Sequence, residues 1–386
     1  MPDPSLTPRT ATRKLAVSLW IVVSLVVFDV AVGAISRMPT DPRVQPSTLQ
    51  LYFDYGRSIE GKLRTLIKPE DEQSGPIVVA GWIDSSCRRT VPNVAGTLGI
   101  SIFGNSFSGQ LSDTLRKLDP AVSVAEYLGP GAPPSHSYAC FVKENSFGGD
   151  RDDVQIIGIT ASSLPRMEQI WGVTTSFEYP QPFTFPRYRL GSDGNLIAHE
   201  PSVRSPDDLR RILSDREKWD DWLAELRAND YFYVQALTTE DPADRSTIAR
   251  MVRRGFGQYI NRSRMAKLRG HDGRFDAPDI VNVLPKMIAS FAKLARASGK
   301  RPIVVLFEEY GYDGALMPLL SDTLARDRIE YVYSGNIVSA DDLRNFASDG
   351  HFSPEANIKI ATALLKLINN RQTNLSVDAV NRETGQ

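Results

Sequence analysis

The serine of Gly104-Asn105-Ser106 is the residue best placed for nucleophilic chemistry. A short β-branched and aromatic run, Ile100–Phe103, precedes it, and a helical pattern of leucines follows it. A serine at such a strand-to-helix corner projects its hydroxyl at the carboxyl edge of a sheet, beside the positive end of a helix dipole. Gly-Asn-Ser is also ordinary turn chemistry, so the corner alone leaves both interpretations open.

A serine nucleophile usually needs a histidine base, and the chain has only 4 histidines. His351 stands out because it follows Asp349-Gly350 and lies just before Ser353-Pro354, where the last amphipathic helical pattern begins. The Asp349 carboxylate can accept a hydrogen bond from the imidazole and hold its tautomer, as the acid of a triad must. The alternative is a surface loop in which Asp349 caps the backbone and His351 is solvated.

Three further features have chemical potential. Glu308 and Glu309 follow a predicted strand and suggest a glycosidase pair, but adjacent residues at a strand end point in opposite directions. The stretch 245–274 is rich in Lys and Arg and suits an anionic glycan or lipid headgroups, with a solvated helix face as the alternative. Cys87 and Cys140 either pair in an oxidising compartment or remain two buried thiols.

The elements that must position these residues alternate between strands and helices. The predicted strands are Ile100–Phe103, Val122–Leu128, Val154–Thr160, Ile303–Phe307 and Glu330–Tyr333. Helical patterns lie between several of them, at 108–118, 280–298 and 315–327. This alternation predicts parallel βαβ units in a three-layer α/β fold, whose ligands gather beyond the carboxyl ends of the strands.

One segment departs from the composition of an ordinary globular protein. Residues 15–35 are apolar apart from Asp29, and their length fits a membrane-spanning helix. The flanking basic residues favour an inside N-terminus and an exported body. A cleaved signal peptide is the alternative, because Val32-Gly33-Ala34 resembles a cleavage site, but the apolar run is long for one. The net charge of −1 gives no global indication of nucleic-acid binding.

The domain boundaries follow from these patterns. We predict a cytoplasmic tail (1–14), a transmembrane anchor (15–35), a linker with a stalk or lid helix at 51–67 (36–97), a catalytic domain (98–372) and a tail (373–386). An insertion at about 166–278 interrupts the alternation between strands 3 and 4. We expect it to hold a hairpin at 183–201, a helix from Ser205-Pro206 to about Arg227 and a second at roughly 244–262, all covering the sheet edge.

The chain resembles the SGNH (GDSL-type) hydrolase superfamily. The resemblance rests on the Gly-Asn-Ser corner and the Asp-Gly-His before the last helix, and it covers 98–165 and 300–370. It implies a flavodoxin-like fold with a mostly parallel five-stranded sheet. It also implies that Ser106 is the nucleophile, His351 the base and Asp349 the acid. Many members place the Asp three residues before the His, where this chain has Ser348. The Asp-x-His spacing is similar to that of the branches that acetylate polysaccharides, and the spacing together with the anchor resembles membrane-anchored O-acetyltransferase and acetylesterase branches.

The resemblance also suggests the groups around the nucleophile. The backbone N–H groups of Ser106 and Gly129 are the implied oxyanion donors. The family normally places an Asn after the third strand; here Thr160 or a nearby serine would have to substitute. Removing one oxyanion donor costs on the order of 3 kcal/mol in other enzymes, so this departure bears on catalytic power. Asn105 and His136 are predicted to contact substrate, with a structural histidine as the alternative for His136.

The implied chemistry is acyl transfer through a seryl ester, with no metal and no organic cofactor. The expected partners are a polysaccharide or other acylated glycan, the membrane through one helix, and a membrane protein that supplies acyl groups. We therefore predict a single-pass protein of the cell membrane with its catalytic domain on the outer side. A non-catalytic glycan-binding or scaffold protein on a degenerate fold is the alternative.

Overall fold

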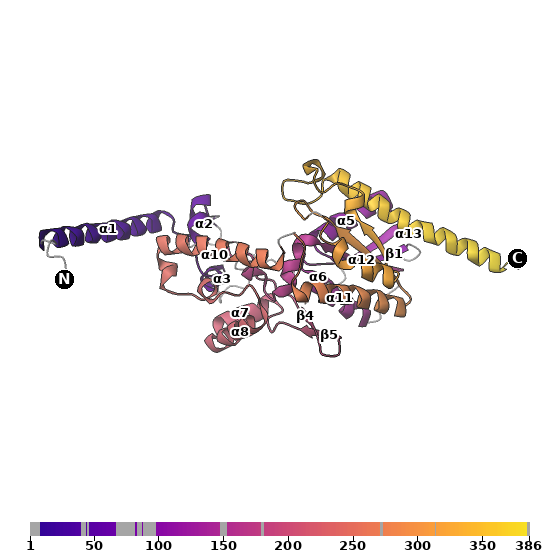
Figure 1. Ribbon diagram of the computed structural model, residues 1–386, viewed down its shortest axis with the longest axis horizontal. Helices are drawn as coiled ribbons and strands as arrows, with labels where there is room; N and C mark the ends of the chain where they lie inside the picture. The colour runs from indigo at the N-terminus through magenta and orange to yellow at the C-terminus, as the bar shows by residue number, and fades with distance from the viewer. Residues whose placement is uncertain are drawn as a thin grey trace, which may run out of the picture. The chain divides into compact units, whose positions relative to one another are not determined.

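The computed structural model describes residues 8–39, 44, 46–66, 82, 87, 98–146, 153–178, 181–270, 273–312 and 314–383. The chain divides into two units. The residue colours of Figure 1 locate the ranges of each unit. The N-terminal unit comprises Met1–Ile77, Val173–Gln181 and Val234–Arg262. The sheet unit comprises Val78–Gly172, Pro182–Tyr233 and Ser263–Gln386. The predicted insertion at 166–278 thus contributes residues to both units.

The sheet unit is built on five parallel strands in the order β2-β1-β3-β6-β7. They are β1 (Leu98–Gly104), β2 (Val122–Leu128), β3 (Val154–Thr160), β6 (Arg301–Phe307) and β7 (Glu330–Tyr333). Three match their predicted bounds, and β1 and β6 begin two residues earlier than predicted. β-Branched runs bounded by turn residues located these strands well because both faces of a parallel sheet are buried. The predicted fold class is confirmed.

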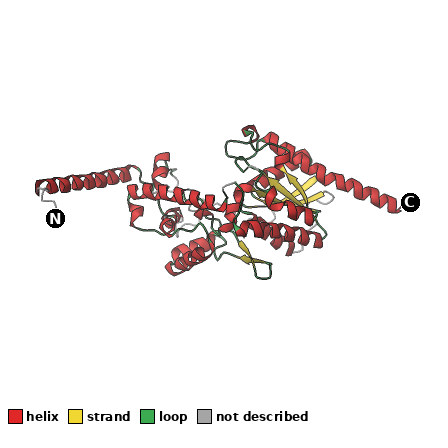
Figure 2. Cartoon of the chain, viewed as in Figure 1, coloured by secondary structure: helices red, strands yellow, loops and turns green. Residues whose placement is uncertain are grey.

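Helices cover both faces of this sheet (Figure 2). On one face lie α5 (Ser106–Leu118) and α13 (Pro354–Glu383), and on the other lie α6 (Pro134–Ser146), α11 (Pro278–Ala297) and α12 (Met317–Arg326). Alternate residues of β1 serve the two layers, with Ile100 and Ile102 in the first cluster and Phe103 in the second. The carboxyl ends of the strands are therefore the free edge at which side chains can meet.

Two predictions in the sheet unit need correction. The helix expected from Ser205-Pro206 to about Arg227 is two helices, α7 (Pro206–Ser214) and α8 (Arg216–Asn229). Ser205 caps α7 as predicted, but Asp215 ends it and accepts hydrogen bonds from the first turn of α8. The tail expected after residue 372 is helical to Glu383, because no Gly or Pro interrupts α13 there. The predicted hairpin is confirmed as β4 (Arg187–Leu190) and β5 (Leu196–His199).

The N-terminal unit is helical. It contains α1 (Pro8–Ile35), α2 (Thr48–Asp54), α3 (Ile59–Leu66), α9 (Gln235–Thr238) and most of α10 (Thr247–Leu268). The continuous helix predicted at 51–67 is wrong. The chain turns at Gly56, where a Cβ atom would lie 1.8 Å from the carbonyl oxygen of Arg250, so α10 packs directly on the break. The strand expected at 77–80 lies outside the described residues.

Residues Arg13–Ile35 of α1 form a helix long and apolar enough to cross a membrane, a property that signal sequences share. Part of the basic stretch predicted for glycans or solvent instead pairs with acids inside the N-terminal unit. The buried guanidinium of Arg253 pairs with the buried Asp244, and Arg254 pairs with Glu178 at 2.9 Å. Burial beside this network lowers the pKa of Lys62 to about 7, although three carboxylates oppose the shift.

Candidate active site

Ser106 is the first residue of α5 and follows the end of β1 by two positions. Asn105 caps the helix, because its Oδ1 accepts a hydrogen bond from the backbone N–H of Phe107 at 3.1 Å. Ser106 is exposed, whereas Asn105 and Phe107 on either side are buried. Its hydroxyl therefore lies at the carboxyl edge of the sheet and at a helix N-terminus, where the backbone favours negative charge.

Two glycines allow α5 to approach the sheet this closely. A Cβ atom at Gly104 would lie 1.9 Å from the Ser108 hydroxyl oxygen, and one at Gly158 would lie 2.1 Å from it. Ser108 is itself fully buried where α5 packs on Gly104 of β1 and Gly158 of β3. The glycine of the Gly-Asn-Ser corner is therefore required by the close packing of α5 on the sheet.

His351 joins Ser106 across 245 positions of sequence. Its Nε2 atom lies 2.7 Å from the Ser106 hydroxyl oxygen, and its ring packs against Phe107 with centroids 4.8 Å apart. A neutral imidazole with its proton on Nδ1 would accept the serine proton at Nε2. The geometry is therefore that of a nucleophile and its base.

Asp349 holds the loop that carries His351. Its Oδ1 atom accepts the backbone N–H of His351 at 3.2 Å, and this bond is the main cause that lowers the pKa of Asp349. Its Oδ2 atom lies 3.1 Å from His351 Nδ1, but the direction is not that of a well-formed hydrogen bond. The Asp349 side chain is 64% exposed, so water competes for the carboxylate. The serine–histidine pair is thus better formed than the histidine–aspartate pair.

The predicted oxyanion residues have other partners in this structure. The Gly129 N–H donates to the carbonyl of Gly104 at 3.1 Å, so it is engaged at the sheet edge. The Thr160 hydroxyl is fully buried and accepts a hydrogen bond from Asn105 Nδ2 at 2.9 Å. Thr160 therefore supports the residue before the nucleophile. The oxyanion roles of Gly129 and Thr160 stay predictions, and that of Gly129 requires its present bond to open.

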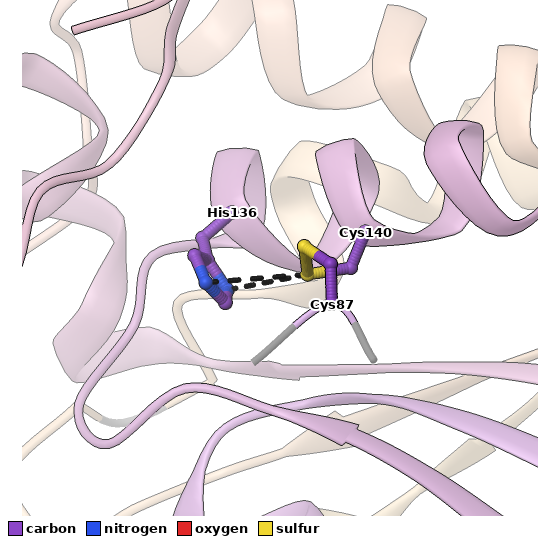
Figure 3. Close-up of side chains that lie close together, drawn as sticks. All are labelled: Cys87, His136 and Cys140. Carbon is purple, nitrogen blue, oxygen red and sulfur yellow. Dashed lines mark hydrogen bonds between the residues drawn. A yellow bond between two sulfur atoms is a disulfide. The ribbon is translucent and has the colours of Figure 1, made fainter. Parts of the chain in front are cut away.

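His136 lies in the core of the sheet unit, in the first turn of α6 (Figure 3). A Cβ atom at Gly129 would lie 2.7 Å from its ring, which explains the glycine there. Cys87 and Cys140 form a disulfide, which resolves the alternative left open by the sequence, and the His136 ring lies beside it. Cysteine binds metal as a thiolate, so this paired form offers only the imidazole as a ligand. The substrate contact predicted for His136 stays a prediction.

Glu309 is a residue near the site whose role the sequence analysis missed. Both of its oxygens are bound by Ser162, one by the backbone N–H and one by the hydroxyl, each at 2.7 Å. Burial raises the pKa of Glu309, and its hydrogen bonds with Ser162 oppose this rise. Glu308 points elsewhere, into a hollow of about 640 Å³ beside Tyr333. The two carboxylates therefore diverge, as the argument against a glycosidase pair predicted. The sequence signal that could have placed Glu309 near the site was its position just after β6, at the carboxyl edge of the sheet.

Aromatic side chains extend from His351 to the surface. Phe107 packs against Phe352 at 5.4 Å between centroids, Phe352 against Phe346 at 5.3 Å, and Phe346 against Tyr310 at 6.5 Å. Tyr310 is 57% exposed. We call Tyr310 and Phe346 the aromatic row. It provides a partly exposed apolar surface connected to the candidate base by direct packing.

Comparisons with known proteins add little to this geometry. No protein-family model matches the chain, and no curated protein matches it. Among solved structures, it is similar to an acetyl xylan esterase from the rumen bacterium Butyrivibrio proteoclasticus, at 11% identity and a TM-score of 0.31. The match covers 73% of this chain and 65% of that one. The chain thus spans about two thirds of that esterase, and the functional argument rests on the site itself.

Proposed function

We propose that this protein is an SGNH-type serine enzyme that transfers or removes acyl groups through a seryl ester. The observation that supports this most is the 2.7 Å contact between the Ser106 hydroxyl and His351 Nε2. The two residues are 245 positions apart in sequence and meet at the carboxyl edge of the sheet. Packing does not require this contact, because Ser106 is exposed and the His351 side chain is 24% exposed. The Asp349 carboxylate lies on the other side of the imidazole, with Oδ2 3.1 Å from His351 Nδ1.

In the proposed reaction His351 Nε2 takes the proton of the Ser106 hydroxyl while the serine oxygen bonds to the ester carbonyl carbon. The tetrahedral oxyanion forms at the N-terminus of α5, where backbone N–H groups favour it. His351 then returns the proton to the departing alcohol, and the C–O bond to that alcohol breaks. Water or a sugar hydroxyl, deprotonated by His351, attacks the acyl-enzyme and regenerates Ser106.

The proposed substrate is an O-acetylated polysaccharide at the cell surface. The aromatic row supports a sugar, because Tyr310 and the partly exposed Phe346, which connect to His351 through Phe352 and Phe107, offer an apolar surface to a pyranose. We propose that α1 anchors the enzyme in the membrane with the sheet unit outside. In the transfer reaction, a membrane partner would deliver the acetyl group made in the cytosol.

Hydrolysis and transfer differ in the acceptor. The exposed position of Ser106 admits both water and a sugar hydroxyl. The engaged Gly129 N–H and the buried Thr160 hydroxyl leave two predicted oxyanion donors without access to substrate, which slows attack by either acceptor. The alternative function is glycan binding without catalysis, for which the aromatic row would be sufficient.

The test measures acetyl release from a chromogenic ester by the full chain, with and without an oligosaccharide acceptor. Wild type should release acetate, and Ser106→Ala should lose that activity while Ser108→Ala, at a buried serine two positions away, keeps it. Acceleration by the acceptor, with acetylated sugar as product, indicates transfer. Labelling of Ser106 by a fluorophosphonate provides a second readout. Silence in both assays, on protein that is folded by circular dichroism, contradicts the enzyme proposal and leaves glycan binding.

A further inference from the structure

Helix α10 presents an exposed apolar stripe within the N-terminal unit. Val252 and Tyr259 are each 69% exposed, and Met251 and Phe256 are each 42% exposed. Their spacing places them on one side of the helix. The other side is packed, because Arg250 and Arg253 are buried and a Cβ atom at Gly257 would lie 2.9 Å from Phe177. An apolar stripe of this kind on an otherwise well-packed helix indicates a contact surface.

This stripe begins where α10 touches α1. The carboxylate of Asp29, the one charge within residues 15–35, accepts a hydrogen bond from the backbone N–H of Ile248 at 2.8 Å. A Cβ atom at Gly33 would lie 3.3 Å from the Thr247 hydroxyl oxygen, so the two helices approach closely. Asp29 thus satisfies the N-terminus of α10, where free N–H groups and the helix dipole favour a negative charge.

The position of this contact along α1 indicates how deep the first turn of α10 would lie in a membrane that α1 spans. Asp29 is six residues before Ile35, the end of the apolar helix, which is about 9 Å at 1.5 Å per residue. If α1 spans a membrane, the first turn of α10 lies near the boundary between acyl chains and headgroups. A partner-free polar backbone end at that depth would be costly, and Asp29 removes this cost.

The order of exposed residues along α10 matches that boundary. Met251 and Val252 are nearest the contact with α1, Phe256 and Tyr259 follow, and the exposed Arg262 comes next. Apolar, aromatic and basic side chains in this order match acyl chains, the interfacial belt and lipid phosphates. A surface for another membrane helix is typically rich in small residues instead. The bilayer is therefore the occupant that the stripe fits best.

We propose that the first turns of α10, from Thr247 to Tyr259, insert into the interface of the bilayer that α1 spans, with Asp29 joining the two helices. This inference rests on the proposed membrane anchor but not on the acyl-transfer chemistry. It gives the N-terminal unit two attachments to the membrane, and it makes Asp29, the one charge within residues 15–35, a structural cap.

The experiment uses single cysteines labelled with the fluorophore NBD on the full chain. The two native cysteines are joined in a disulfide, so an introduced thiol is labelled selectively without reductant. Three positions are compared, namely Val252→Cys in the stripe, Val23→Cys in α1 and Ala266→Cys, an exposed site about 21 Å further along α10. The protein is reconstituted in vesicles of phosphatidylcholine and phosphatidylglycerol, in which some acyl chains carry nitroxide quenchers.

We expect strong quenching and a blue-shifted emission at 23 and 252, and neither at 266. Quenching at 23 with water-like emission at 252 overturns the proposal and leaves the anchor intact. Quenching at neither position overturns the anchor and this proposal together. Protection of 252 in native membranes, but not in protein-free lipid, assigns the stripe to a protein partner and overturns the lipid assignment.

A pair of substitutions tests the cap. Asp29→Leu removes the acceptor and should reduce quenching at 252 several-fold while leaving quenching at 23 unchanged. Asp29→Asn keeps an amide oxygen for the Ile248 N–H and should retain quenching at 252. Equal quenching at 252 in Asp29→Leu and wild type would show that Asp29 does not hold α10 at the membrane.

Discussion

The sheet unit contains two histidine clusters that differ in one physical respect. His351 lies at the sheet edge, where its side chain is 24% exposed and meets a serine hydroxyl and a carboxylate. His136 is completely buried beside the Cys87–Cys140 disulfide and faces the ring of Phe185 edge-on. Both lie near the start of a helix, because His136 is the third residue of α6 and His351 lies three residues before α13. Access to solvent and to a proton partner is what separates them.

The difference shows how burial decides what a histidine can do. Complete burial lowers the pKa of His136 to about 4, so its ring stays neutral at neutral pH and contributes packing. His351 keeps access to water and to the Ser106 hydroxyl, which a general base requires. A histidine beside two sulfurs attracts attention as a site, yet the half-exposed histidine beside a serine is the better candidate.

The largest expected effect is on activity. His351→Gln should lower ester turnover on the order of 10³-fold or more, because it removes the base that activates Ser106. His136→Gln should leave turnover within a few-fold of wild type while lowering thermal stability. Chromogenic ester kinetics and calorimetry on both variants measure this contrast. Equal losses of turnover in two folded variants would break the distinction between the clusters.

The second effect is on stability. Replacing both cysteines, as Cys87→Ala with Cys140→Ala, should lower the free energy of unfolding by about 4 kcal/mol in the chain-entropy estimate for a loop of 53 residues. Denaturant unfolding provides the measurement, with the slope fitted separately for each protein because removing a disulfide expands the unfolded chain. Residual ester turnover at low temperature is the control, since the Ser106–His351 contact does not involve the disulfide. A loss of well under 1 kcal/mol would contradict this role of the bridge.

A third prediction concerns pH. The folded-state pKa of His136 is depressed to about 4 from 6.5, so the unfolded chain binds an extra proton between these values. The resulting stability is fully present above pH 6.5 and is lost as the pH falls towards 4, by an amount of about 3 kcal/mol. Unfolding free energies of wild type and His136→Gln across this range test it. Parallel curves for the two proteins would exclude His136 as the source.

The smallest effect is expected at Asp349. Its carboxylate is mostly exposed and is poorly directed at His351 Nδ1, so Asp349→Asn should lower turnover only about tenfold, far less than the loss of a buried triad acid. The same variant keeps an oxygen for the His351 backbone N–H. A loss as large as that of His351→Gln would mean that the aspartate closes onto the imidazole when substrate binds.

Much of the fold was predictable because local patterns reflect burial. The runs at 122–128, 154–160 and 330–333 are strands with their predicted bounds. The run at 154–160 is buried along its whole length, as the middle of a parallel sheet demands, whereas 330–333 is a partly exposed edge strand. The failures occurred where one residue interrupts a helical pattern. Asp215 splits a helix by capping the next one through the nearby N–H groups of Glu217 and Lys218, a local signal that the sequence analysis missed. Gly56 breaks another because α10 packs against it, and that partner is not visible in the local sequence.

The sequence by itself determined the parallel sheet, the apolar N-terminal helix and the choice of Ser106, His351 and Asp349 as candidate site residues. These depend on residue type, spacing and the rule that strand ends meet at one edge. Only the tertiary structure decided that Ser106 and His351 are in hydrogen-bond contact, that His136 is buried and that Asp29 caps α10. Contacts between residues far apart in sequence depend on packing distances, which composition and periodicity do not contain.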